Sequence, residues 1–165
     1  MDSVDLLLAQ WAEERPDLDM GPVALVARVI RISTWLSRRT EQWLSPLGLT
    51  WESFSLIVTL RRAGAPFQKR PSELQEESLL SSGAMTNRID RVEALGLVVR
   101  LRDPNDRRGV IVQLTTEGRK LADKAIEVHT TELKALLRGI RASDRAVLKK
   151  LLGGWLSELE QSAAA

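Results

Sequence analysis

The fold is decided by residues 81–114, which read SSGAMTNRIDRVEALGLVVRLRDPNDRRGVIVQL. The first half places apolar side chains at helical spacing, at Met85, Ile89 and Val92, and ends at a glycine. The second half contains two runs rich in β-branched residues, 97–102 and 110–114, around the turn-rich segment 103–109. This stretch therefore predicts a helix of about 83–95, capped by a serine, followed by a β-hairpin with a long loop.

The residues before this stretch predict two more short helices. Thr50 can cap a helix that ends near residues 64–66, and Pro71 suits the first position of a helix that runs to about Ser78. Two short helices joined by a tight turn and followed at once by a hairpin have the order of a winged helix-turn-helix. We therefore expect a mainly α fold with a small β-hairpin wing, in which residues 49–114 form a DNA-binding region.

The flanking segments predict long helices with wide apolar faces, at about 2–14, at 23–47 and from residue 115 onward. These faces contain four of the five tryptophans: Trp11, Trp35, Trp43 and Trp155. The helices either fold back onto the protomer or pair with a second copy. We expect a homodimer, because distal terminal helices cannot easily reach a small central core. Residues 1–48 and 115–165 are accordingly assigned to dimerisation, within one intertwined domain.

The predicted helix 83–95 presents a polar face opposite its apolar one. A helical wheel places Gly83, Asn87 and Arg91 on that side and Thr86 on its flank. Asparagine can read adenine, arginine can read guanine or hold phosphate, and glycine lets the backbone come close to DNA. The alternative is an ordinary solvated helix face.

The predicted hairpin loop carries paired arginines beside a carboxylate, at Arg107, Arg108 and Asp106. An arginine at such a tip can enter the minor groove, and a neighbouring carboxylate can orient its guanidinium. The alternative is a plain soluble turn, since Asp-Pro-Asn-Asp is also common turn chemistry. The candidate DNA-binding residues are Ser82, Gly83, Thr86, Asn87, Arg91, Arg102, Asp106, Arg107 and Arg108. In a two-fold dimer the two reading helices would lie about 34–36 Å apart, which predicts a pseudo-palindromic DNA site.

Charge and composition narrow the function classes. The net charge is +2, but residues 1–22 hold six acidic side chains and one arginine, so the remainder is distinctly basic and suits a polyanion such as double-stranded DNA. The chain has no cysteine and one histidine, so we expect no metal centre and no cofactor. An acidic N-terminus and the lack of an 18-residue apolar run predict no signal peptide, no membrane partner and a cytoplasmic location.

Two other function classes were weighed. His129 has Glu127 and Glu132 nearby, but it falls on a predicted long helix without a phosphate-binding loop or nucleophile motif, so we expect no enzyme. A winged-helix module that binds only proteins is the second alternative. It predicts no salt-dependent affinity for DNA, whereas DNA binding weakens steeply as salt rises.

With these residues in view, the chain resembles the MarR family of bacterial transcription regulators over nearly its whole length. The most specific stretches are Leu80–Glu93, Gly96–Val98 and Asp103–Gly109. The resemblance implies an obligate dimer that represses a divergently placed gene and leaves DNA when it binds a small anionic ligand. Residues 14–19 and the extra N-terminal helix are similar to the urate-responsive branch of that family.

That branch is marked by a tryptophan on the extra helix, by an aspartate and an arginine seven residues apart, and by a second arginine on the reading helix. Trp11, Arg62 and Arg88 match three of these places, and Ser55 occupies the place of the aspartate. The resemblance therefore implies a ligand site at these four positions. Because serine supplies no carboxylate, the expected ligand is an aromatic or carboxylate anion, such as one resembling salicylate, rather than necessarily urate. The alternatives are a structural ion pair for Arg62, phosphate contact for Arg88 and packing for Trp11.

Overall fold

The computed structural model describes residues 1–78, 80–104, 106 and 109–163. The chain divides into two compact units, residues 1–126 and 127–165, and the boundary falls within the long helix α6 (Thr116–Leu136). Each unit is described by itself below.

The first unit begins with α1 (Ser3–Glu14) and α2 (Gly21–Leu44), followed by the short 3₁₀ turn η1 (Ser45–Leu47). The Asp2 side chain caps α1 by accepting hydrogen bonds from the backbone N–H groups of Val4 and Asp5. The Asp5 side chain in turn accepts a hydrogen bond from the Asp2 backbone N–H. Arg28 on α2 forms ion pairs with both aspartates. The start of α1 is thereby fastened to α2 by charge-assisted bonds.

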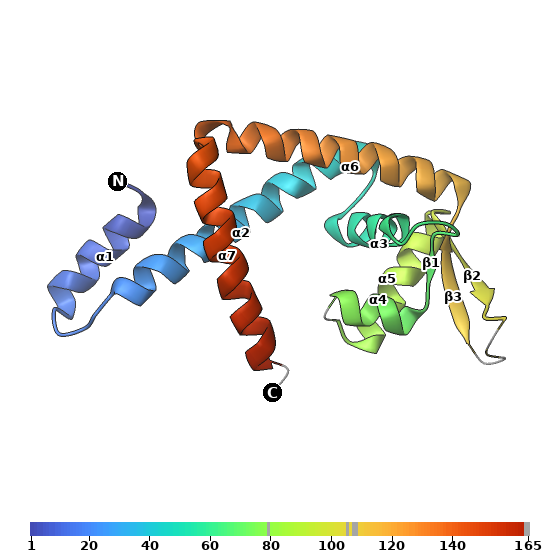
Figure 1. The fold of residues 1–165 in the computed structure, drawn as a ribbon, viewed down its shortest axis with the longest axis horizontal. Helices are drawn as coiled ribbons and strands as arrows, with labels where there is room; N and C mark the ends of the chain where they lie inside the picture. The colour runs from blue at the N-terminus through green and yellow to red at the C-terminus, as the bar shows by residue number, and fades with distance from the viewer. Residues whose placement is uncertain (79, 105, 107–108, 164–165) are drawn as a thin grey trace. The chain divides into compact units, whose positions relative to one another are not determined.

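The winged helix-turn-helix follows in the same unit. It consists of α3 (Trp51–Arg62), β1 (Gln68–Lys69), α4 (Pro71–Ser78), α5 (Ser82–Ala94), β2 (Val98–Arg102) and β3 (Val110–Leu114). The strands form an antiparallel sheet in the order β1-β3-β2, in which Arg102 pairs with Val110 and Lys69 with Val112. In Figure 1, α3, α4 and α5 lie together with the sheet beside them.

The core of this unit lies where α3, α4, α5 and the sheet meet. Ile57, Leu60, Leu74 and Val112 are completely buried there. The start of α6 closes the core, since Ala122 and Ala125 are buried in the same cluster. The Thr115 hydroxyl caps α6 by accepting a hydrogen bond of 2.9 Å from the backbone N–H of Gly118.

The second unit contains the rest of α6, the 3₁₀ turn η2 (Leu137–Gly139) and α7 (Ala142–Ala163). Its apolar side chains are largely exposed along α7, at Val147, Leu148, Leu151, Leu152, Leu156 and Leu159. Exposed apolar side chains also run along α1 and α2, including Leu6, Trp11, Leu25, Ile30, Ile32 and Trp35. Apolar surface on this scale is typical of a surface that another molecule covers.

The structure confirms the predicted mainly α fold and adds one strand to it. Thr50 caps α3 and a serine caps α5 as expected; that serine is Ser81, and Gly96 ends α5 with a φ of 72°. The strand β1 was not predicted, because two residues without alternation give no strand signal. The region from residue 115 onward forms two helices, and the second of them begins at Ala142.

Candidate nucleic-acid interface

The helix α5 buries one face and exposes the opposite one, as its sequence predicted. Met85, Ile89 and Val92 are each 1% exposed in the core. The candidate residues on this helix are all exposed: Ser82, Gly83, Thr86, Asn87 and Arg91. The Ser81 hydroxyl accepts a hydrogen bond of 3.4 Å from the backbone N–H of Ala84 and so marks where the helix begins.

Two of the candidate side chains on the exposed face form hydrogen bonds within the helix. The Thr86 hydroxyl donates to the Ser82 carbonyl at 3.0 Å, and Arg91 Nε donates to the Asn87 carbonyl at 3.2 Å. Within the part of the chain that the structure describes, the Asn87 side chain has no hydrogen-bond partner. Exposed local bonds to backbone carbonyls are exchanged at little cost, so these groups are available to base edges or phosphates.

The hairpin formed by β2 and β3 is tied to α5 through Arg100 on β2. Its guanidinium pairs with Asp90 at 2.5 Å and also with Glu93, and the Arg100 backbone N–H donates to Glu93 at 3.0 Å. The candidate Arg102 is exposed at the end of β2, and Asp106 is exposed in the loop. The candidates Arg107 and Arg108 lie outside the described residues.

A second ion pair at the hairpin base was missed by the sequence analysis. Arg70, just before α4, donates from Nε to the Asp103 carboxylate at 2.6 Å. The Asp103 side chain is fully buried. The two residues are 33 positions apart, and no sequence pattern connects them.

Arg88 lines a pocket of about 340 Å³ between the start of α3 and the second half of α5. Arg91, Glu52, Thr50 and Ser53 are also in its lining. Hydrogen bonds from its own backbone N–H and from Thr50, followed by the charges of Arg88 and Arg91, hold the pKa of Glu52 below its ordinary value. Two guanidinium groups and two hydroxyl groups surround the opening together with one carboxylate, so its lining carries a net positive charge of one.

The other proposed ligand residues lie elsewhere in the first unit. Arg62, at the end of α3, is exposed and pairs with Glu77 on α4, while Ser55 is half-buried on α3. Hydrogen bonds from Lys69 and then from Arg62 lower the pKa of Glu77. The structural ion pair considered for Arg62 is therefore present.

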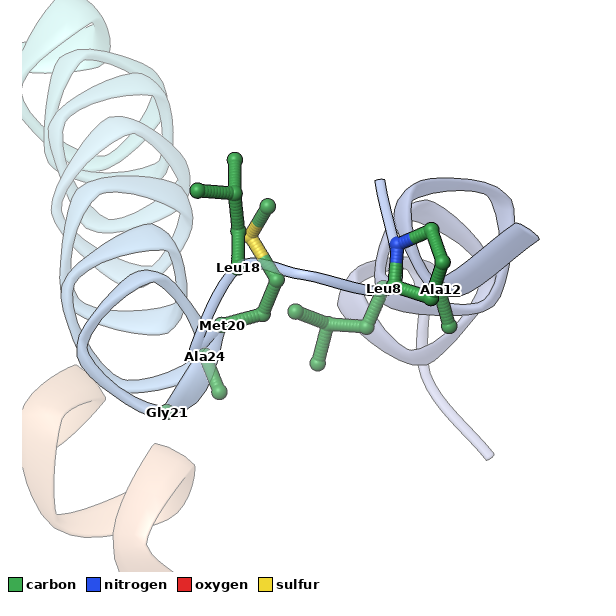
Figure 2. A pocket seen from close by; sticks show the side chains of 7 residues that line it. Leu8, Ala12, Leu18, Met20, Gly21 and Ala24 are labelled. Atoms are coloured by element: carbon green, nitrogen blue, oxygen red, sulfur yellow. The ribbon is translucent and has the colours of Figure 1, made fainter. Parts of the chain in front are cut away.

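Trp11 is 44% exposed on α1 and does not line the pocket beside it. That pocket has a volume of about 420 Å³, and Figure 2 shows Leu8 and Ala12 of α1 on one side and Leu18, Met20 and Ala24 on the other. Its lining contains no charged side chain, so it offers an anion no counter-charge.

The structure also bears on metal binding and on membrane insertion. Within residues 1–78, 80–104, 106 and 109–163, no three histidine, cysteine or acidic side chains gather as they would around a metal ion. No helix of that same part is both long enough and apolar enough to span a membrane.

An exposed polar face on α5 beside a wing-like hairpin defines a winged helix-turn-helix protein of the kind that reads duplex DNA. The sequence profile of the MarR family matches residues 49–110. The HTH-type transcriptional regulator PecS of Dickeya dadantii is 33% identical over 147 residues, which are 89% of either chain. The multiple antibiotic resistance protein MarR of Escherichia coli is 34% identical over 70% of this chain and 78% of its own.

The fold is also similar to that of a solved MarR structure. A mutant MarR from E. coli complexed with operator DNA superposes with a TM-score of 0.71 and 29% identity, covering 88% of this chain and 97% of that one. The chain belongs to the MarR family of DNA-binding transcriptional regulators.

Proposed function

We propose that the chain is a homodimeric, ligand-responsive repressor that binds a pseudo-palindromic DNA duplex. The observation that carries this proposal is the orientation of α5. Thr86, Asn87 and Arg91 face outward, while Met85 and Ile89 hold the opposite side in the core. Phosphate contacts from helix ends and from the hairpin would set the register, and these three outward side chains would choose bases.

The homodimer is supported by the exposed apolar faces of the terminal helices. On α7, Leu151 and Leu156 are more than half exposed, as are Leu25 and Ile30 on α2. Burial of such side chains against a second copy is favourable by about 25 cal/mol for each Å² removed from water. In a two-fold dimer, the two copies of α5 would contact two DNA half-sites about 34–36 Å apart. DNA as the partner of this dimer implies a cytoplasmic location.

The DNA-binding set remains Ser82, Gly83, Thr86, Asn87 and Arg91 on α5, together with residues of the hairpin. The hairpin residues are Arg102, Asp106, Arg107 and Arg108. The exposure of every described member supports this assignment, since a buried side chain could not reach DNA. The hairpin is held against α5 by Arg100, so both parts can approach one duplex together.

The effector that we propose is a small aromatic or carboxylate anion, bound with the help of Arg88. The pocket that Arg88 shares with Arg91 supports this, because its two guanidinium groups outnumber its one carboxylate, Glu52, with which a bound anion would compete. Trp11, Ser55 and Arg62 complete the proposed set by their similarity to the urate-responsive branch. Ser55 offers a hydroxyl in place of a carboxylate, which favours carboxylate ligands over a urate-type response.

Release of DNA would follow from a shift between two dimer arrangements. A ligand that binds more tightly to a dimer with wrongly spaced reading helices moves the population away from DNA. A reduction of DNA binding by about 100-fold requires about 2.7 kcal/mol of differential affinity. Arg91 lines the pocket and is also proposed to contact DNA, so a bound ligand would compete directly with DNA for this side chain.

Selection of binding sites from random duplexes, with and without benzoate, salicylate or urate, tests the proposal. We expect two half-sites related by a two-fold axis, an affinity that falls steeply with salt, and release by a carboxylate anion. Asn87→Ala should lose about 1–3 kcal/mol of discrimination between the selected and a scrambled duplex. The matched control Gln161→Ala removes an exposed amide outside the proposed DNA-binding set and should leave this discrimination unchanged. Absence of any enriched site and of salt dependence would support the protein-binding module instead.

A further inference from the structure

The residue before α4 occupies a capping position but carries an arginine. The Arg70 carbonyl accepts the N–H of Leu74 at 3.1 Å, and the Arg70 N–H donates to Glu73 at 2.7 Å, so residue 70 is the N-cap. Serine, threonine, aspartate and asparagine are favoured there because they accept a bond from the helix. An arginine accepts none, so its side chain is free for another purpose, and it reaches Asp103 at 2.6 Å.

Asp103 lies where the hairpin loop begins, directly after β2. Its N–H donates to the Gly109 carbonyl at 3.0 Å, and its carbonyl accepts from the N–H of Asp106. The backbone of Asp103 therefore closes the base of the loop. Its carboxylate is 0% exposed, whereas the Arg70 side chain is 51% exposed. A buried carboxylate is costly without a charged partner, and Arg70 supplies one.

The pair connects opposite edges of the sheet. Arg70 continues the chain from the edge strand β1, Asp103 continues it from the other edge strand β2, and β3 lies between them. A cavity of about 180 Å³ beside the pair is lined by Glu73, Pro104 and Ile111, among others. Besides the pairing of β1 with β3, the ion pair directly connects the start of α4 with the hairpin base.

We propose that Arg70 and Asp103 are positioning residues for DNA binding, whose ion pair sets the direction in which the hairpin leaves the helix-turn-helix. The inference rests on the proposed function, since it concerns how two DNA-facing parts are held at a fixed angle. Arg100 fixes β2 to α5, and Arg70 fixes the loop end of β2 to α4. With both ion pairs intact, the hairpin and α5 can contact the same DNA duplex at the same time.

Asp103→Asn separates positioning from simple electrostatics. The change removes one negative charge, so electrostatics alone predicts tighter DNA binding. Loss of positioning predicts weaker binding instead, by about tenfold, which corresponds to about 1.4 kcal/mol. The matched control is Asp17→Asn, which removes the carboxylate of the exposed Arg15–Asp17 pair far from this junction in sequence. The control should bind as tightly as the wild type or slightly more tightly.

The experiment measures affinity and hydroxyl-radical footprints on a duplex selected with the wild-type protein. For Asp103→Asn we expect weaker binding and loss of protection at the outer edges of the site, where the hairpins lie, with central protection retained. Equal or tighter binding with an unchanged footprint would overturn the inference alone. A wild-type protein that binds no duplex would overturn the proposed function as well.

Arg70→Lys provides a second test in case Asp103→Asn folds poorly. Thermal unfolding shows whether each variant is folded. The lysine keeps the positive charge and leaves the buried carboxylate paired, but it replaces the planar, two-donor geometry of arginine. We expect the same loss of outer protection, to a smaller degree. A folded Arg70→Lys protein with the full wild-type footprint and affinity would contradict a positioning role.

Discussion

Arg62 at the end of α3 donates a hydrogen bond of 2.5 Å to the carboxylate of Glu77 on α4. Lys69 pairs with the other oxygen of the same carboxylate, also at 2.5 Å. One of the four proposed ligand residues is thus already engaged by the protein. A ligand that recruits Arg62 must therefore compete with Glu77 for the guanidinium group.

Arg62→Ala should abolish ligand-induced release while leaving DNA affinity nearly intact, because Arg62 is not among the proposed DNA contacts. An exposed ion pair contributes at most about 1 kcal/mol, so the variant should fold normally. Glu77→Gln is the complementary variant, since it frees Arg62 and should lower the anion concentration needed for release. Titration of preformed protein–DNA complexes with salicylate measures both. A normal response from Arg62→Ala would remove this residue from the ligand site.

Arg108→Ala should weaken DNA binding by about tenfold without dissociating the dimer, if the hairpin tip enters the minor groove. Gel-shift titration reports the affinity, and sedimentation reports the oligomeric state. Arg141→Ala is the matched control, because it removes an exposed arginine that pairs only locally with Asp144 at the start of α7. If both variants bind DNA like the wild type, the assignment of the hairpin tip fails.

Gly118→Ala should destabilise the first unit. A Cβ atom at this position would lie 1.9 Å from the Leu97 carbonyl oxygen, which also accepts the Thr115 N–H at 3.0 Å. Overpacking against backbone costs about 1–3 kcal/mol or more. Gly83→Ala on α5 meets nothing within 4 Å and should gain about 0.5–1 kcal/mol. Denaturant unfolding compares the two, and Gly83→Ala should still bind DNA more weakly because the backbone can no longer approach closely.

His129 should make stability depend on pH between neutrality and mild acid. Burial holds the pKa of this half-buried imidazole below its ordinary 6.5. The folded state therefore binds fewer protons than the unfolded state in that window, and stability falls as the pH drops from 6.5 toward the folded pKa. The chain has no other histidine. His129→Gln should therefore reduce the dependence of the thermal midpoint on pH, measured from pH 7.5 to the lower end of that window. An unchanged slope would show that other groups cause it.

Local chemistry made most of the helical architecture predictable. The spacing of Met85, Ile89 and Val92 identified the buried face of α5, and hydroxyl caps located several helix starts. The strand β1 could not be predicted, because Gln68 and Lys69 form a strand only through their pairing with β3. Short strands carry too little periodicity to be recognised without their partners.

The site was predictable only where it depends on a single element. The outward face of α5 follows from a helical wheel, and its exposure is confirmed. The ion pairs of Arg62 with Glu77 and of Arg70 with Asp103 join different elements, 15 and 33 positions apart. Such partners depend on how the elements pack, which charge patterns along the chain do not reveal. The DNA and ligand contacts assigned from the sequence stay predictions.

The hairpin also has a consequence for regulation. Its inner strand β3 is bonded to β1, which leads directly into α4, and to β2, which Arg100 joins to α5. A large swing of the wing by itself would break this strand pairing, while the Arg70–Asp103 pair sets the finer direction of its loop end. The reading helix and the wing must therefore travel as one rigid block, and an effector would alter the seating of whole blocks on the duplex rather than deform either one internally.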